Sequence, residues 1–136
     1  MDSPYVVRTL VVEDNPFWQQ MIVKKLQEQR TLQVIAIVAD GLEAVHNAEE
    51  LQPDLVLLDI GLPRLSGIEV AKRLRKVAPA ARVLFVSGDF CSDIIGEGLR
   101  IGALGYVHKP KVGITLLPAI QAVLGDIVSG SALAAN

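Results

Sequence analysis

The sequence PDLVLLDIGLP, residues 53–63, sets the architecture of this chain. Four consecutive apolar residues, 55–58, stand between a proline-led turn and the carboxylate of Asp59. A short, unbroken apolar run with turn residues on both sides is typical of a strand buried on both faces, as in parallel sheets. We therefore expect Asp59 at the carboxyl end of a central strand, on a turn that continues through Gly61.

Similar apolar runs recur on both sides of this stretch, separated by longer amphipathic segments. They cover residues 9–12, 34–38, 83–86 and 104–107. Five short strands that alternate with five helices through short loops form a doubly wound, open parallel sheet of the α/β class. The sequence therefore predicts one domain over residues 1–128, with a tail or the start of a linker at 129–136.

Three of the expected helices have clear start signals. These are the Asn15-Pro16 pair and two sets of residues with capping-box spacing, Asp40 with Glu43 and Ser66 with Glu69. Proline cannot continue a helix, so Pro53 and Pro79 are expected to end the second and third helices. Trp18 falls on the apolar stripe of the first helix and is interpreted as a packing residue without a functional role.

The last two helices are predicted with less support from the sequence. A fourth helix over residues 92–101 contains Gly96 and Gly98, each of which costs about 1 kcal/mol relative to alanine. Pro118 is tolerated only in a first turn, where its missing N–H has no partner to lose, so the fifth helix is expected to begin near Thr115 and to run to about Val128. Its apolar residues exceed what one buried stripe requires, which favours contact with a partner such as a second copy of the chain; they are Ile120, Val123, Leu124, Ile127 and Val128.

Composition and charge exclude several classes of function. The 136 residues carry a formal net charge of -2, which gives no field for direct binding to nucleic acid or to an anionic membrane. No apolar run approaches the roughly 20 residues that a membrane helix needs. Cys91 is the only cysteine, so no internal disulfide is possible and a reducing compartment is favoured. The residue itself is interpreted as a small buried hydrophobic side chain. We therefore expect a soluble, cytoplasmic protein.

Polar residues interrupt this apolar framework at the ends of the predicted strands. Glu13 and Asp14 follow the first strand, Asp59 the third, Ser87 the fourth and Lys109 the fifth. The carboxyl ends of parallel strands lie along one edge of a sheet, and ligands bind in the crevice where the strand order reverses. Three carboxylates that meet there repel one another unless a cation compensates, and an all-oxygen set suits Mg2+. A magnesium site is therefore predicted.

The same arrangement indicates a phosphoryl-transfer site. A carboxylate such as Asp59 can attack phosphorus to form an acyl phosphate, and the equatorial oxygens of the transition state then need stabilisation. Lys109 would supply a positive charge and the Ser87 hydroxyl a hydrogen bond. The sequence leaves both isomers of the Lys109–Pro110 bond open, and a cis bond would aim the ammonium inward.

At this point the chain resembles the response-regulator receiver family over nearly its whole length. The matching motifs are LVVEDN (10–15), PDLVLLDIGLPRLSG (53–67), VLFVSG (83–88) and GALGYVHKP (102–110). The resemblance implies the flavodoxin-like receiver fold with strand order 2-1-3-4-5. It also implies that Asp59 is the phosphoacceptor and that Glu13, Asp14, Asp59 and the Gly61 carbonyl bind Mg2+.

The resemblance further implies a switch. In this family Ser87 would move toward the phosphoryl group and Tyr106 would turn inward, altering the surface of the fourth helix, fifth strand and fifth helix. The donor would be a histidine kinase or a histidine phosphotransfer protein. The residues from 105 to 123 look closest to receivers of helix-turn-helix transcription factors, although no helix-turn-helix output domain lies within these 136 residues. Such a chain is a switch and not an enzyme, with at most self-phosphorylation and self-dephosphorylation.

Some positions depart from the family pattern. Asp89 adds a negative charge near the mouth of the predicted pocket, and Gly61 offers no side chain to shield a phosphoryl group.

Two other classes of function fit the sequence less well. A Mg2+-dependent aspartyl-nucleophile phosphohydrolase would need an acid or base beside the nucleophile, and Gly61 provides none. A flavin or nucleotide module would need a glycine-rich phosphate loop after the first strand, where Glu13 and Asp14 stand instead.

Overall fold

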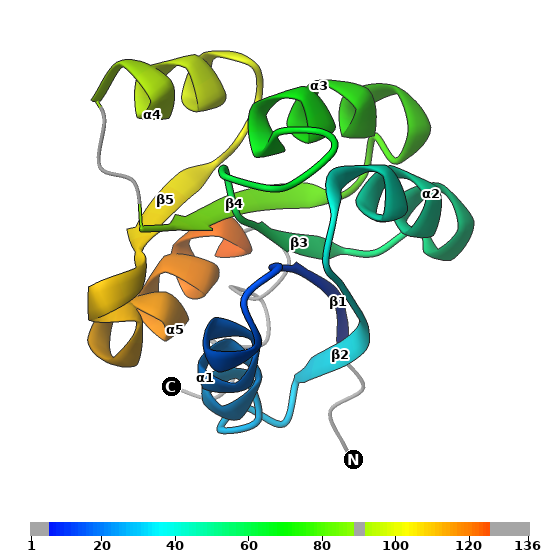
Figure 1. Cartoon of the computed structure of the whole chain (residues 1–136). Helices are drawn as coiled ribbons and strands as arrows, with labels where there is room; N and C mark the ends of the chain where they lie inside the picture. The colour runs from blue at the N-terminus through cyan, green and yellow to red at the C-terminus, as the bar shows by residue number, and fades with distance from the viewer. Residues whose placement is uncertain (1–5, 89–91, 126–136) are drawn as a thin grey trace.

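A computed structural model describes residues 6–88 and 92–125 as five parallel strands and five helices. The strands are β1 (Val7–Val12), β2 (Leu32–Val38), β3 (Leu55–Leu58), β4 (Arg82–Ser87) and β5 (Gly105–His108). The helices are α1 (Pro16–Leu26), α2 (Gly41–Leu51), α3 (Gly67–Val77), α4 (Ser92–Arg100) and α5 (Val112–Val123), with a short 3-10 turn at Lys109–Lys111. The sheet order is β2-β1-β3-β4-β5, which confirms the predicted fold (Figure 1).

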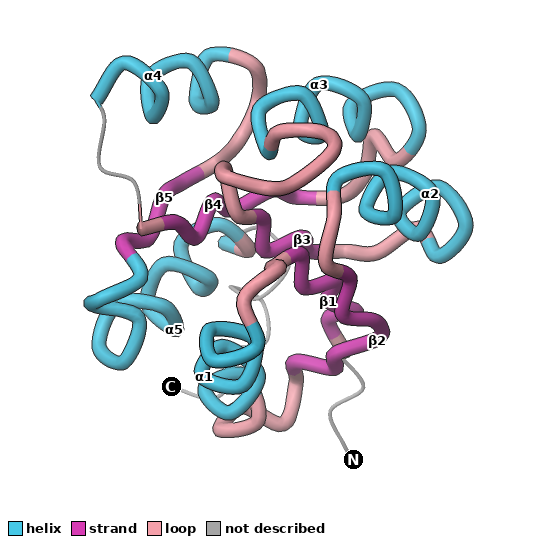
Figure 2. The backbone as a smooth tube through the Cα atoms, viewed as in Figure 1, coloured by secondary structure: helices cyan, strands magenta, loops and turns pink. Residues whose placement is uncertain are grey.

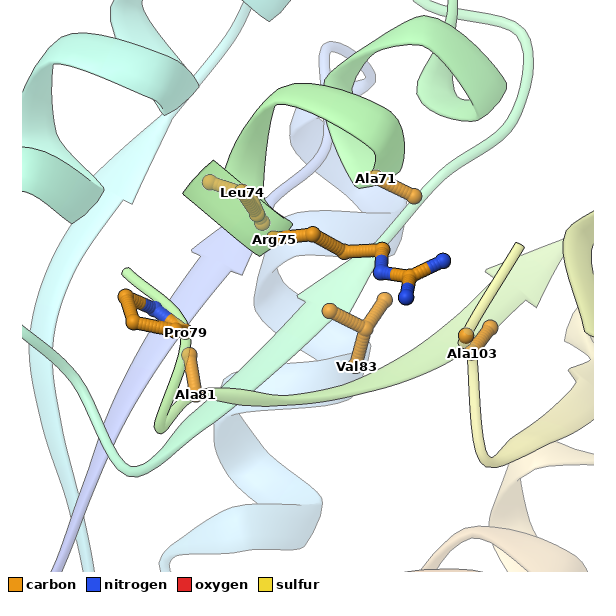
Figure 3. A pocket seen from close by; sticks show the side chains of 8 residues that line it. Ala71, Leu74, Arg75, Pro79, Ala81, Val83 and Ala103 are labelled. Carbon is orange, nitrogen blue, oxygen red and sulfur yellow. The ribbon is translucent and has the colours of Figure 1, made fainter. Parts of the chain in front are cut away.

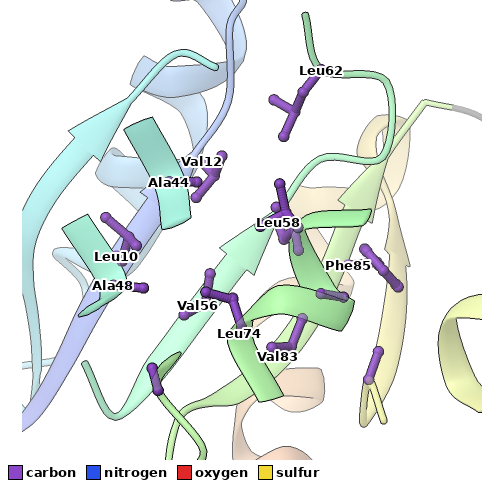
Figure 4. Close-up of a cluster of buried hydrophobic side chains, with 14 of the residues drawn as sticks. Leu10, Val12, Ala44, Ala48, Val56, Leu58, Leu62, Leu74, Val83 and Phe85 are labelled. Carbon is purple, nitrogen blue, oxygen red and sulfur yellow. The ribbon is translucent and has the colours of Figure 1, made fainter. Parts of the chain in front are cut away.

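The helices cover the two faces of the sheet, as the tube drawing shows (Figure 2). Helices α2, α3 and α4 lie on one face, and α1 and α5 lie on the other. Each face has its own hydrophobic core. Figure 4 shows the core under α2 and α3, where Val56 and Phe85 of the sheet meet Ala48 and Leu74 of the helices. Because both faces are covered, β3 is buried at all four residues, as its apolar run predicted.

Strand register brings the first acidic pair and Asp59 to the same edge of the sheet. Val12 at the end of β1 is paired with Leu58 at the end of β3. One residue further, the Asp59 N–H donates to the Val12 carbonyl at 3.0 Å, and the Glu13 N–H donates to the Val38 carbonyl at 3.0 Å. The ladder bonds therefore continue past the strands and fix the backbone of both acidic positions.

The predicted helix starts are confirmed by side-chain caps. The Trp18 N–H donates to Asn15 Oδ1 at 3.1 Å, with Pro16 as the first residue of α1. The other two caps are bonds from the Glu43 N–H to Asp40 Oδ1 at 2.9 Å and from the Glu69 N–H to Ser66 Oγ at 3.3 Å. Each cap satisfies one of the backbone donors that a helix start leaves unpaired.

The fifth helix begins earlier than predicted. It starts at Val112, directly after the 3-10 turn, and carries Pro118 in its interior instead of its first turn. Val112 is 1% exposed, so its burial in the core draws the first turn of α5 onto the sheet. This packing outweighs the hydrogen bond to the Ile114 carbonyl that Pro118 cannot donate. Val128, the predicted end, lies outside the described residues.

The expectation of a homodimer loses part of its basis, because most of the apolar residues behind it are buried within this chain. Ile120, Val123 and Leu124 of the apolar surplus are buried in the core of this chain. The remaining two residues of that argument, at 127 and 128, lie outside the described part of the chain. No described helix is both long and apolar enough to cross a membrane.

Helix α4 contacts the sheet at a glycine. A Cβ added to Gly98 would lie 2.2 Å from Cε2 of Phe85 in β4, so only glycine permits this approach. At Gly96 an added Cβ would meet nothing within 4 Å. Both glycines were predicted to destabilise this helix relative to alanine. They differ in their surroundings, because packing against Phe85 requires glycine at 98 but not at 96.

A cavity of about 360 Å3 lies between α3 and the loop that enters β5 (Figure 3). Val83 and Ala71 are among its apolar lining residues, and Arg75 extends across it. The Arg75 guanidinium donates to the carbonyl of Ile101 at 2.9 Å, which ties the end of α4 to α3. The cavity is lined by none of the polar residues that follow the strands.

Candidate functional site

The three predicted acidic residues meet at the carboxyl edge of the sheet. One carboxylate oxygen from each of Glu13, Asp14 and Asp59 lies within 4.8 Å of the others. Glu13 and Asp59 are 1% and 5% exposed, whereas Asp14 faces solvent. The cluster therefore combines two buried carboxylates with one that a ligand can reach from outside.

Lys109 enters the same cluster from the other side. Its Nζ atom lies 2.7 Å from Glu13 Oε1 and donates to Asp59 Oδ2 at 3.2 Å. The contact with Glu13 Oε1 is an ion pair that lacks directed hydrogen-bond geometry. Lys109 is only 8% exposed, so its ammonium has little contact with bulk water and is held by the two buried carboxylates. The predicted convergence of a lysine on the carboxylates is seen in the structure.

The Lys109–Pro110 bond does not use the cis isomer that was left open. The described residues contain no cis peptide bond. The ammonium instead reaches the cluster because Lys109 begins the 3-10 turn Lys109–Lys111, with Pro110 inside that turn. The turn directs the side chain inward without an unusual peptide geometry.

The buried carboxylate of Glu13 is easier to protonate than an ordinary glutamate. Burial raises its pKa above 4.5, while the Lys109 ammonium and a hydrogen bond from the Asn15 N–H act in the opposite direction and the charge of Asp59 raises it further. The Asn15 N–H donates to Glu13 Oε2 at 3.0 Å. A carboxylate that is costly to ionise without a cation fits a metal site.

Backbone packing fixes the loop that carries Asp59. The Gly67 N–H donates to the Ile60 carbonyl at 2.8 Å, and a Cβ on Gly67 would lie 2.2 Å from the Asp59 carbonyl oxygen. The start of α3 can approach this loop only because residue 67 is glycine. On the other side, Gly61 is exposed and a Cβ there would meet nothing within 4 Å. The Asp59 loop is therefore held by α3 on one side and has open space around Gly61 on the other.

Ser87 and Tyr106 lie on the two neighbouring strands β4 and β5. Ser87 is the last residue of β4 and is 2% exposed. The Tyr106 hydroxyl donates to the Ser87 carbonyl at 3.2 Å, and its ring packs against the core under α3 and α4. The two residues that the family resemblance singled out are thus bonded to each other. Their roles in a switch remain predictions.

The donor set suits Mg2+. Three carboxylates supply only oxygen ligands, and their convergence leaves a net negative charge that the single Lys109 ammonium does not balance. Zn2+ would favour nitrogen and sulfur ligands, and the cluster contains neither histidine nor cysteine. The Gly61 carbonyl stays a predicted fourth ligand.

One contact at the site was missed. Lys109 Nζ lies 5.8 Å from the ring centroid of Trp18, in cation-π geometry. The helical periodicity placed Trp18 on the apolar stripe of α1 as a packing residue, but the structure leaves it half-buried, whereas Ile22 on the same stripe is 1% exposed. Sequence spacing could not show that Lys109 lies close to its ring. Asp89 and Cys91 lie outside the described residues.

Comparison with known proteins identifies the family. A family model described as the response regulator receiver domain matches residues 9–121. The chain therefore belongs to the response regulator receiver domain family of two-component signalling. The crystal structure of the response regulator domain of Thermotoga maritima CheB has a TM-score of 0.78 and 35% identity to this chain. The match covers 87% of this chain and 96% of that one.

Two curated relatives carry the same domain within longer proteins. A protein-glutamate methylesterase/protein-glutamine glutaminase of Thermotoga maritima is 40% identical over 113 residues, or 82% of this chain and 33% of the relative. The transcriptional regulatory protein LnrK of Bacillus subtilis is 32% identical over 118 residues, or 87% of this chain and 54% of LnrK. The chain thus spans about a third and about half of these relatives, and the receiver is the shared part.

Proposed function

We propose that this receiver accepts a phosphoryl group on Asp59 in a Mg2+-dependent reaction and so acts as a two-component switch. The observation that carries the proposal is the convergence of Glu13, Asp14 and Asp59 within 4.8 Å, with Lys109 Nζ bonded to Asp59. A mere turn aspartate would have neither a buried ammonium nor two further carboxylates beside it.

Each residue has a separate task in the proposed reaction. An Asp59 carboxylate oxygen forms a bond to phosphorus, while the bond from phosphorus to the donor atom breaks and the donor leaves with that electron pair. Glu13, Asp14 and Asp59 would hold Mg2+, together with the Gly61 carbonyl, and the bound ion would balance charge on the phosphoryl oxygens. The Lys109 ammonium would exchange its bond to Asp59 for one to a phosphoryl oxygen.

The donor is proposed to be a phosphorylated histidine of a kinase or a phosphotransfer protein. The open space around the exposed Gly61 supports an approach from this side, because residue 61 puts no side chain between solvent and the loop that carries Asp59. The absence of a side chain there also leaves no acid or base to drive turnover of phosphate esters, which favours a switch over a phosphohydrolase.

The proposed output is a change at α4, β5 and α5. Ser87 would reorient its hydroxyl toward the phosphoryl group, and Tyr106 would respond because its hydroxyl is bonded to the Ser87 carbonyl. In this proposal the bond would connect the backbone of Ser87 to the ring of Tyr106, so that a change at the phosphoryl site reaches the surface of β5.

Acetyl phosphate tests the proposal without knowledge of the natural kinase. Incubation with acetyl phosphate and Mg2+, followed by intact mass measurement, is expected to add one phosphoryl group to the wild type and none to Asp59→Asn. Asp93→Asn removes an exposed carboxylate on α4 and serves as the matched control, which should be labelled like the wild type. Equal labelling of Asp59→Asn and wild type would contradict the assignment of Asp59.

A further inference from the structure

Trp18 lies where the first helix meets the acidic cluster. It is the third residue of α1, and its own N–H is the donor that the Asn15 side chain caps. Its half-buried ring packs edge-on against the exposed ring of Phe17, with centroids 5.1 Å apart. The Asn15 cap, directly after Glu13 and Asp14, therefore fixes the backbone from which this indole extends.

We propose that Trp18 is a positioning residue for Lys109, covering its ammonium on the α1 side. The idea rests on the proposed function, in which Lys109 serves the phosphoryl group. The Nζ atom has Glu13 and Asp59 as charged neighbours at 2.7 and 3.2 Å, and the indole centroid lies 5.8 Å away. The ring thus supplies one wall of the space that holds this ammonium.

An indole face suits a lysine that must change partners. The ring attracts a cation through its π electrons but provides no directed acceptor, so it does not compete for the three ammonium N–H donors. A third carboxylate in its place would hold the ammonium away from an incoming phosphoryl oxygen. The attraction also varies little as the ammonium slides over the ring, so Lys109 can turn from Asp59 toward phosphorus while it remains covered.

The same ring keeps water from the ammonium. Lys109 is 8% exposed, and the low local dielectric strengthens its bonds to Glu13 and Asp59. With Trp18→Leu, water enters on the α1 side and the lysine samples more rotamers. Phosphorylation by acetyl phosphate should then slow about three- to tenfold, because a smaller fraction of the molecules holds Lys109 in place, and the loss of a partly desolvated cation-π contact changes a population by about this factor. Trp18→Phe retains an aromatic face and should stay within about twofold of the wild type.

A labelling experiment tests the cover without any phosphorylation. Limiting acetic anhydride is applied to the folded protein, and peptide mass measurement compares acylation of Lys109 with that of the exposed Lys111 as an internal reference. Trp18→Leu should raise the Lys109-to-Lys111 ratio at least about threefold, while Trp18→Phe leaves it near the wild-type value. An unchanged ratio in Trp18→Leu would overturn the proposal.

A second measurement uses the wild-type residue itself, so it does not depend on how Trp18→Leu folds. Trp18 is the only tryptophan, and its fluorescence should change in intensity or wavelength in Lys109→Met but not in the control Lys111→Met. Identical emission from both variants would contradict contact between the ring and Lys109. If Asp59 is never phosphorylated, the proposed function fails while both of these tests keep their meaning.

The kinetic arm shows whether Trp18 acts through Lys109. In a Lys109→Met background, adding Trp18→Leu should cause no further loss in the rate of phosphorylation by acetyl phosphate. A full additional three- to tenfold loss would show that Trp18 acts on something other than the lysine and would overturn the positioning role.

Discussion

Helices α3 and α4 lie next to each other on one face of the sheet but are attached to it very differently (Figure 1). Helix α3 starts with the Ser66 cap and buries four residues: Gly67, Val70, Ala71 and Leu74. Helix α4 buries only Gly98, against Phe85. Helix α3 also supports the Asp59 loop through Gly67, whereas α4 leads into β5, which carries Tyr106 and is followed directly by Lys109.

This difference indicates how a small domain would hold the proposed phosphoacceptor in place while another of its surfaces changes shape. Burying less apolar surface makes a segment cheaper to displace, and local stability falls with it. The loop of Asp59, the proposed acceptor, rests on the firmly attached α3, while the proposed output surface includes the loosely attached α4. The division predicts that substitutions in the two helices will have very different costs.

The largest expected effect is in the core under α3. Leu74→Ala removes a side chain that is 1% exposed and should lower the free energy of unfolding by about 2–5 kcal/mol. Leu99→Ala in α4 removes one that is 45% exposed and should cost within about 0.5 kcal/mol. Urea unfolding of both variants measures the contrast. Similar costs for the two leucines would contradict the difference in attachment.

A smaller effect is expected at the contact between α4 and the sheet. Gly98→Ala forces a methyl group onto the Phe85 ring and should destabilise the domain by about 1–3 kcal/mol. Gly96→Ala is its matched control, because open space surrounds that position and the better helix propensity should add up to about 1 kcal/mol. Thermal unfolding should therefore move in opposite directions, and stabilisation by Gly98→Ala would refute the close approach.

The fold was predictable from sequence to the extent that local pattern and core burial agree. The run at 55–58 identified a buried strand, and the caps at Asn15 and Ser66 marked helix starts, because each signal is local. The start of α5 was misplaced because Pro118 was weighed by its own preference, while burial of Val112 by the rest of the fold decided the outcome.

The site was predictable in its members but not in its packing. Strand ends in a parallel sheet must share an edge, so the meeting of Asp59, Glu13 and Lys109 followed from topology and from the family resemblance. The contact of Trp18 with Lys109 depends on the position of α1 relative to the segment that carries Lys109. The close approach of Gly98 to Phe85 depends on how α4 packs against β4. Neither distance can be predicted from the spacing of residues in the sequence.

The smallest expected effect concerns the pH dependence of the metal-free protein. The folded-state pKa of Glu13 is raised above 4.5 by burial, so in the window above 4.5 the folded chain binds more protons than the unfolded one. The contribution of Glu13 to stability is therefore complete below pH 4.5 and is lost as the pH rises through the raised pKa.

Glu13→Gln removes that loss while keeping the shape of the side chain. Urea unfolding in chelator should show that the stability difference between the variant and the wild type grows in favour of the variant as the pH rises above 4.5. A difference that moves toward the wild type with rising pH would mean that ionised Glu13 stabilises the metal-free fold.

The shared binding of one divalent ion by the acidic cluster is tested most directly by calorimetric titration with Mg2+. The wild type and the surface control Glu50→Gln should bind one ion per chain with the same affinity. Asp14→Asn and Asp59→Asn should each bind at least about tenfold more weakly, because each loses a charged oxygen ligand. Wild-type affinity in both of these variants would show that Asp14 and Asp59 hold no common ion.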